Sequence, residues 1–308
     1  MAPGFRRMLQ YGRTYYKNHV SFGYLLAVAI LLGILLYYNY TVTALARALS
    51  SEGAPAWVGR YLLYAVPFFA AYLLQPLFFK QLNYPRKKWF WILLVLAPAI
   101  FTFRVQLNLS AIIPAHNEEW TSSIVSPYTV KLFIKSWALV LPAAICWYWM
   151  DGNATHRYGL RKTPGLQAYV IPVFLMLPFL WWASFGAAFL QQYPRAFRAV
   201  SHPDTASLAT WLAFEIIYAF DFLSIEFFFR AFLILGFLRF AGVHAIIPAA
   251  CFYCCIHLDK PLAEAISSFF GGWLLGIICY NSKSIWGGLL IHVGIAWLME
   301  LFAWLQQH

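Results

Sequence analysis

The chain has 308 residues, of which 62% are hydrophobic and only 11% are charged, and its formal net charge at pH 7 is +11. An ordinary soluble domain carries about 25% charged residues, so this composition excludes one. The basic residues lie mostly in short stretches beside long apolar ones. Lys and Arg in such places act as topology signals and contact anionic lipids, so the positive charge does not indicate a nucleic-acid partner.

Apolar stretches long enough to cross a bilayer recur along the whole chain. They predict an all-α, polytopic helical membrane protein with about nine transmembrane helices. We expect these helices at residues 22–40, 56–79, 89–103, 130–150, 166–190, 211–238, 244–258, 262–280 and 284–305. The sixth would be about 42 Å long at about 1.5 Å per residue, which exceeds a hydrocarbon thickness of about 30 Å. It must therefore tilt, kink or protrude.

The distribution of charge divides the chain into three regions. Residues 1–20 form a basic N-terminal tail, residues 21–208 a five-helix membrane region, and residues 209–304 a core in which polar residues inside apolar stretches become frequent. A cytoplasmic N-terminus would place most of the Lys- and Arg-rich loops in the cytoplasm. The first 20 residues are too polar and basic for a cleavable signal peptide. We expect a multi-pass protein of the plasma (inner) membrane.

An acid and a base stand four residues apart within the sixth apolar stretch. Glu226 and Arg230 share one helix face at this spacing, and two histidines, His257 and His292, follow in apolar surroundings. Charged groups at bilayer depth are costly, usually face the inside of a bundle and mark functional sites. We therefore expect these four side chains to converge in one polar cavity between the sixth, seventh and ninth helices.

Such a group has the components needed to hydrolyse a peptide bond inside a membrane. The reaction needs a water, a base that activates it and hydrogen-bond donors for the oxyanion. Glu226 can act as the base, the two histidines can share the proton or donate to the oxyanion, and Arg230 can keep Glu226 ionised and oriented. The alternative is a structural ion pair that locks the bundle, with His257 as an interfacial residue.

Further acids lie near this group in the sequence. Glu264 falls in the first turn of the eighth helix, where it is either a second carboxylate of the site or an acid that favours the helix N-terminus. Asp221 lies about 140° around the helix from Glu226, so we expect it to pair with another helix, through Lys135.

Two more acids stand near the ends of predicted helices. We expect Glu215 at a cleft mouth or the membrane interface, and Glu300 at the interface. Small residues are frequent in the eighth helix and favour close helix packing. They are Ser267, Ser268, Gly271, Gly272 and Gly276.

Other catalytic motifs of membrane hydrolases are absent from the sequence, including His-Glu-x-x-His, Gly-x-Ser-x-Gly and Gly-x-Gly-Asp. Two histidines and a glutamate can ligate zinc. Their spacing in this chain gives no independent support for a metal, so we expect no cofactor.

The same residues resemble the CAAX protease and bacteriocin-processing (CPBP or Abi) family of intramembrane endopeptidases. The family signature is Glu-Glu-x-x-x-Arg, then an aromatic residue four places before a His, then His-x-x-x-Asn. Glu226 and Arg230 match the second Glu and the Arg of the first motif. Tyr253 and His257 match the second motif, and His292 matches the third.

The resemblance covers about residues 210–304 and has two departures. Ile225 stands where the family has its first Glu, which is usually assigned as the water-activating base. Ala296 stands where the family has Asn or Asp, a partner of the oxyanion site. The base role would then fall to Glu226, with Glu264 as a second acid of the site.

The resemblance implies an intramembrane endopeptidase that hydrolyses a peptide bond of a membrane-associated protein or peptide, with membrane lipids as its surroundings. The alternative is a non-catalytic family member that acts as a membrane scaffold, immunity or regulatory protein. A transporter or channel is a third hypothesis, but the inverted repeats and broken helices typical of transporters are not apparent.

Overall fold

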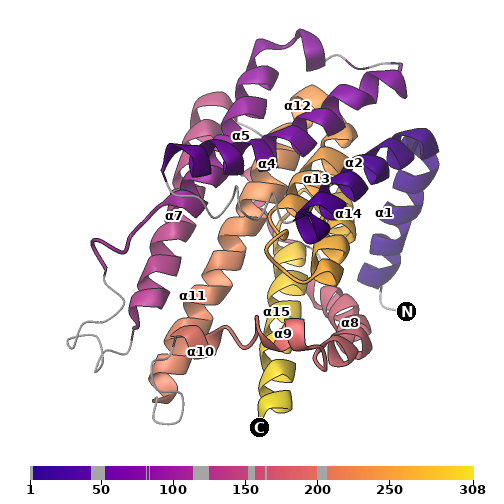
Figure 1. Ribbon diagram of the computed structural model, residues 1–308. Coiled ribbons are helices and arrows are strands. Elements are labelled where there is room, and N and C mark those ends of the chain that lie inside the picture. Colours follow the sequence, from indigo (N-terminus) through magenta and orange to yellow (C-terminus); the bar gives the residue numbers. More distant parts are fainter. Residues whose placement is uncertain are drawn as a thin grey trace.

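The computed structural model describes residues 3–42, 53–80, 82, 84–113, 125–151, 157–163, 165–199 and 207–308. In this part of the chain the fold is a bundle of helices (Figure 1). Eight of its helical segments are long and apolar enough to cross a membrane. The predicted fold class, an all-α polytopic membrane protein, is confirmed.

The region before residue 208 supplies five of the eight segments. Its long helices are α1 (Pro3–His19), α2 (Phe22–Thr41), α4 (Ala54–Leu74), α5 (Lys88–Gln106), α7 (Pro127–Asp151) and α8 (Val170–Ala183). Short turns lie between them or lead out of the region: η1 (Gln75–Leu77), η2 (Tyr84–Arg86), η3 (Arg157–Gly159), η4 (Leu166–Tyr169), α9 (Ala187–Leu190) and α10 (Ala196–Ala199).

The remaining region holds the predicted site residues. It consists of α11 (Leu208–Glu226), the π-helix η5 (Phe227–Leu235), α12 (Leu238–Ala241), η6 (Gly242–Ala245), α13 (Ile246–Cys255), α14 (Leu262–Ser282) and α15 (Trp286–Gln307). The Ser207 side chain accepts a hydrogen bond from the Thr210 backbone N–H and caps the start of α11. Helices α11 and η5 run on without a break, as the unusual length of the sixth apolar stretch requires.

The structure differs from the prediction at the seventh helix. We expected a span at residues 244–258, but the regular helix there is α13, which has only ten residues. Ten residues rise about 15 Å, half of the hydrocarbon thickness of a bilayer. All ten residues of α13 are buried within the protein. Helix α13 instead ends the helical segment Leu208–Cys255, whose 48 residues count as one of the eight candidate spans where the sequence predicted two.

Helix α13 is the centre of the bundle and packs against α4, α14 and η5. Its Phe252 ring contacts a group of buried aromatic rings that includes Tyr64 and Phe68 of α4. On the other side, glycines of α14 leave room for it. A Cβ atom at Gly272 would lie 3.1 Å from the Tyr253 ring, and one at Gly276 would lie 3.0 Å from Ile246. These two small residues therefore have the expected packing role.

Asp221 joins α11 to two helices of the N-terminal region. Its carboxylate forms an ion pair with Arg104 of α5 and accepts a hydrogen bond of 2.7 Å from the Ser136 hydroxyl of α7. The expectation that Asp221 pairs with another helix is correct, but the expected partner Lys135 is not the one observed. The Lys135 ammonium donates instead to the Val105 carbonyl oxygen, at 3.4 Å.

We predict that Asp221→Ala lowers the free energy of unfolding by about 3–5 kcal/mol, because it leaves the Arg104 charge unpaired in a site about nine-tenths buried. Thermal unfolding of the purified protein in detergent measures the effect. Lys135→Met is the control and should cost clearly less. Equal losses in the two variants would contradict the Arg104 assignment.

Candidate active site

The first predicted acid ends an α-helix, and a wider helix begins directly after it. Glu226 is the last residue of α11, and Arg230 lies in the following π-helix η5. The π-helix ends with a hydrogen bond from the Gly236 N–H to the Ala231 carbonyl, at 2.8 Å, five residues back. All nine residues of η5 are buried. π-Helical turns are rare and occur frequently at functional sites.

Glu226 and Arg230 form an ion pair closed off from solvent. Glu226 Oε1 lies 3.1 Å from an Arg230 terminal guanidinium nitrogen, and the two side chains are 0% and 1% exposed. The guanidinium also lies over the Tyr253 ring, 4.7 Å from its centroid. A cation–π contact of this kind is worth more when the cation is desolvated, about 2 kcal/mol. Three elements, α11, η5 and α13, thus meet at one buried charge.

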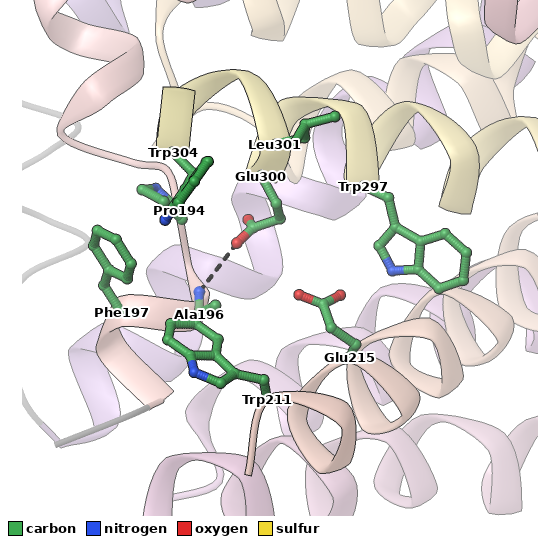
Figure 2. A pocket seen from close by; sticks show the side chains of 9 residues that line it. All are labelled: Pro194, Ala196, Phe197, Trp211, Glu215, Trp297, Glu300, Leu301 and Trp304. Carbon is green, nitrogen blue, oxygen red and sulfur yellow. Dashed lines mark hydrogen bonds between the residues drawn. The ribbon is translucent and has the colours of Figure 1, made fainter. Parts of the chain in front are cut away.

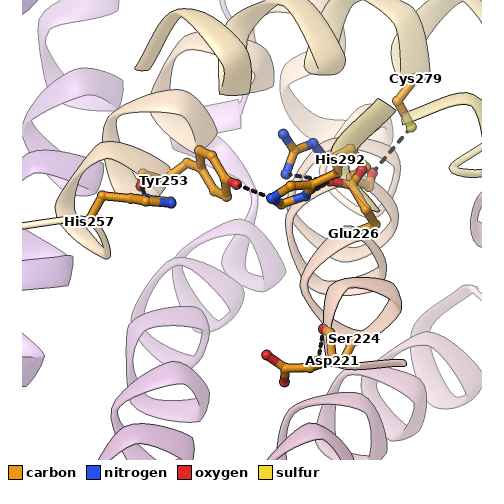
Figure 3. Close-up of polar contacts among 8 residues, drawn as sticks. Asp221, Ser224, Glu226, Tyr253, His257, Cys279 and His292 are labelled. Atoms are coloured by element: carbon orange, nitrogen blue, oxygen red, sulfur yellow. Dashed lines mark hydrogen bonds and ion pairs between the residues drawn. The ribbon is translucent and has the colours of Figure 1, made fainter. Parts of the chain in front are cut away.

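His292 of α15 extends this ion pair into a hydrogen-bond chain (Figure 3). Its Nδ1 lies 2.9 Å from Glu226 Oε1, and its Nε2 lies 2.9 Å from the Tyr253 hydroxyl. An ionised carboxylate only accepts, so Nδ1 carries the proton and donates it to Glu226. In a neutral ring Nε2 then accepts from the Tyr253 O–H. The Phe222 ring packs edge-on against the imidazole, with centroids 4.4 Å apart.

His257 joins the group through the backbone of Tyr253. Its Nδ1 donates to the Tyr253 carbonyl oxygen at 2.8 Å, and its ring lies 4.7 Å from the Tyr253 ring. His257 stands between the segments that could cross a membrane. Burial lowers the pKa of His257 to about 3, so its imidazole stays neutral near pH 7. Glu226, Arg230, His257 and His292 are therefore all brought together around Tyr253.

Glu264 takes part in a different contact. It lies in the first turn of α14, as expected, and its carboxylate accepts a hydrogen bond of 2.9 Å from the Tyr193 hydroxyl. The side chain is half-buried rather than standing in open solvent. Glu264 has no contact with the Glu226–His292–Tyr253 chain among the hydrogen bonds of the described residues. Its place in catalysis stays a prediction.

The two positions that depart from the family signature are occupied by core residues. Ile225 is 7% exposed and belongs to the main hydrophobic core. Ala296 is 4% exposed and packs in a smaller cluster with Phe214 and Tyr218. Neither position supplies a polar group.

The sequence analysis treats Tyr253 only as an aromatic match. The sequence analysis did not predict the hydrogen bond between the Tyr253 hydroxyl and His292. Tyr can form this bond at this position, whereas Phe cannot.

The donor set of the described residues gives no support to a metal. No group of three or more His, Cys, Asp or Glu side chains in this part of the chain is arranged to hold one. His292 uses both ring nitrogens in hydrogen bonds to protein groups, and Glu226 Oε1 is shared by Arg230 and His292.

Comparison with known proteins addresses the same region. Residues 207–298 match the family model described as "Type II CAAX prenyl endopeptidase Rce1-like". The resemblance to the CAAX protease and bacteriocin-processing family is confirmed. The matched segment runs from the residue before α11 to the middle of α15, and so contains the whole Glu226–His292–Tyr253 chain of this CAAX protease-like core. Comparison with curated proteins and with solved structures gave no match.

We predict that Glu226→Ala lowers the free energy of unfolding by about 3–5 kcal/mol, because it leaves Arg230 buried without its counter-charge. The measurement is thermal unfolding in detergent. Glu226→Gln keeps the shape of the side chain and a hydrogen-bond acceptor, so its free energy of unfolding should fall by less than that of Glu226→Ala. A Glu226→Ala protein as stable as the wild type would show that Arg230 does not depend on this pair.

Gly288 of α15 offers a second test, because its missing side chain makes room for Glu226. A Cβ atom there would lie 2.8 Å from Glu226 Oε2, whose carboxylate is held by two partners. We predict that Gly288→Ala lowers stability by about 1–3 kcal/mol through overpacking. Gly271→Ala is the matched control, because a Cβ atom there meets nothing within 4 Å. The control should be neutral or stabilising by up to about 1 kcal/mol, through helix propensity.

Proposed function

We propose that this protein is an intramembrane endopeptidase that hydrolyses a peptide bond of a membrane-associated protein or peptide. The observation that carries the proposal is the continuous chain from Glu226 through His292 to the Tyr253 hydroxyl. The family match supports it, because the matching family is a protease family. We also propose a plasma (inner) membrane location with a cytoplasmic N-terminus.

The contacts of Glu226 favour a supporting role for its carboxylate. Glu226 Oε1 forms an ion pair with the Arg230 guanidinium at 3.1 Å and accepts from His292 Nδ1 at 2.9 Å, so this oxygen is already engaged by two partners. The carboxylate instead holds the His292 ring in the tautomer whose Nε2 is free to accept, and it stabilises the imidazolium that forms when Nε2 is protonated. A buried carboxylate has the same two effects in Ser-His-Asp hydrolases. His292 Nε2 is therefore the base.

The reaction then follows from the position of Tyr253. Substrate entry turns the Tyr253 hydroxyl toward the scissile carbonyl, and a water takes its place at His292 Nε2. The water oxygen attacks the carbonyl carbon, and its proton moves to Nε2. Tyr253 donates to the oxyanion. The imidazolium next gives its proton to the amide nitrogen, the C–N bond breaks, and a carboxylic acid and an amine leave.

The remaining predicted residues support this arrangement. His257 fixes the end of α13 by donating to the Tyr253 carbonyl, at 2.8 Å. Glu264 stays in the proposal as a second acid of the site. Tyr193 orients its carboxylate through the 2.9 Å hydrogen bond. Glu264→Gln should lower activity without loss of stability, whereas a helix cap would leave activity unchanged.

The test uses the full-length protein in liposomes with membrane-anchored peptide libraries, with and without a prenyl group. We expect cleavage by the wild type and a loss of at least about 10²-fold in kcat for both Glu226→Gln and His292→Gln, since each removes part of the base. Mass spectrometry of the products identifies the bond. Equal cleavage by wild type and both variants would overturn the proposal.

The Tyr253 hydroxyl can be tested alone. We predict that Tyr253→Phe lowers kcat by about 10²–10³-fold, the loss expected for one oxyanion donor, with little change in KM. The ring that supports Arg230 is retained, so the loss of stability should not exceed about 1–3 kcal/mol, the cost of leaving His292 Nε2 without its partner. Tyr16→Phe is the matched control, because Tyr16 is 71% exposed, and it should leave kcat unchanged.

A non-catalytic family member is the second candidate. The observation that favours it is the pair of apolar residues, Ile225 and Ala296, at positions where the family carries polar ones. In that case Glu226, Arg230 and His292 would serve only to hold three helices together. The variants would then change thermal stability, and the wild-type protein would cleave no peptide in the liposome assay.

A further inference from the structure

A cavity of about 430 Å³ lies well away from the proposed active site (Figure 2). It is formed where α10, the first turns of α11 and the last turns of α15 meet, at the end of the bundle that holds the C-terminus (Figure 1). Six of its lining residues matter for recognition: Phe197, Trp211, Trp297, Trp304, Glu215 and Glu300. None of them belongs to the Glu226–His292–Tyr253 chain.

The first feature of the cavity is its aromatic wall. Three tryptophans and a phenylalanine line it, and a tryptophan face is the strongest cation–π partner among side chains. Trp297 and Trp304 are 48% and 45% exposed, and the Trp304 ring stacks on His308 with their centroids 4.9 Å apart. Aromatic cages of this kind recognise organic ammonium groups.

The second feature is a pair of carboxylates. Glu300, which we expected at the interface, is buried within the protein, and its two oxygens accept from the Arg195 and Ala196 backbone N–H groups at 3.0 and 3.1 Å. Glu215 points into the same space from α11 (Figure 2). The Trp297 indole interacts with the Glu215 side chain, whose Oε2 is buried and has no hydrogen-bond partner among the described residues. Two carboxylates in one cavity repel each other, and a bound cation would offset this electrostatic repulsion.

The third feature is the depth of the cavity. Glu215 lies seven residues after the start of α11, and Glu300 lies seven residues before the end of α15. Both are therefore about 10 Å from their helix ends. Helix α15 has 22 residues and is about 33 Å long, close to the hydrocarbon thickness of about 30 Å. Trp211 and Trp304 stand three residues, or about 5 Å, from the ends of α11 and α15, so the mouth of the cavity is nearer the headgroups than its two carboxylates are.

We propose that this cavity binds the ammonium headgroup of a membrane lipid. An organic cation fits better than a metal ion, because Glu300 is already held by backbone donors and the other walls are aromatic. The ammonium would lie against the tryptophan faces, with Glu215 as its counter-charge. This inference does not depend on the peptidase function.

The test measures lipid binding by the full-length protein in a maltoside detergent. Short-chain phosphatidylcholine, phosphatidylethanolamine and phosphatidylglycerol are titrated separately, and the shift in melting temperature gives each half-saturation concentration. We expect a saturable rise with at least one of the two ammonium lipids at a concentration at least tenfold below that for phosphatidylglycerol. A protein of net charge +11 attracts anionic lipid non-specifically. A preference for an ammonium lipid over phosphatidylglycerol therefore indicates a specific site.

Variants locate the binding to the cavity. Glu215→Gln and Trp304→Leu should each raise the half-saturation concentration of the preferred ammonium lipid at least fivefold. Trp149→Leu is the control for loss of a tryptophan, because Trp149 is 80% exposed on α7, and it should change nothing. The proposal is overturned if no ammonium lipid binds saturably, if phosphatidylglycerol binds as well, or if both cavity variants bind like the wild type. Tighter binding of a lysine-containing soluble peptide than of either lipid would assign the cavity to peptides instead.

Discussion

The core of this protein depends on one requirement, that Glu226 and Arg230 stay paired where water does not reach them. Their side chains are 0% and 1% exposed, in a bundle that is otherwise apolar at this depth. An unpaired charge in such surroundings costs several kcal/mol, so the neighbours of the pair are strongly constrained. His292 donates to the carboxylate, Tyr253 lies under the guanidinium, and Gly288 leaves the space that the carboxylate fills.

The same requirement explains why a short helix stands at the centre of the fold. Helix α13 has only ten residues, and all ten are buried. It holds Tyr253 between Arg230 and His292. The Tyr253 ring lies under the Arg230 guanidinium, and the Tyr253 hydroxyl hydrogen-bonds to His292 Nε2. A Phe at this place would support the cation but would leave His292 Nε2 without its partner. Close packing against Gly272 keeps α13 near enough to α14 for this arrangement.

Local features of this region could be predicted from the sequence, but long-range partners could not. The spacing of Glu226 and Arg230 on one helix face fixes their contact, and the scarcity of charge elsewhere singles out His257 and His292. Nothing local distinguishes Lys135 from Arg104 as the partner of Asp221, because both lie in other helices. The burial of Glu300 depends on a loop, residues 191–199, folding back onto α15. The π-helix after Glu226 has no pattern that a period of 3.6 residues would reveal.

Helices α11 and α15 carry both the proposed active site and the acidic cavity. Glu215 and Glu226 lie on one face of α11, eleven residues or about 16 Å apart, and Glu300 and His292 lie eight residues or about 12 Å apart on α15. At one depth the two helices are held together by the hydrogen bond from His292 to Glu226. At the other depth Glu215 and Glu300 face one cavity from the two helices, beside the apolar packing of Phe214 and Tyr218 against Ala296. A cation bound there, as proposed above, would reduce the repulsion between the two carboxylates and so add to the attraction between the helices.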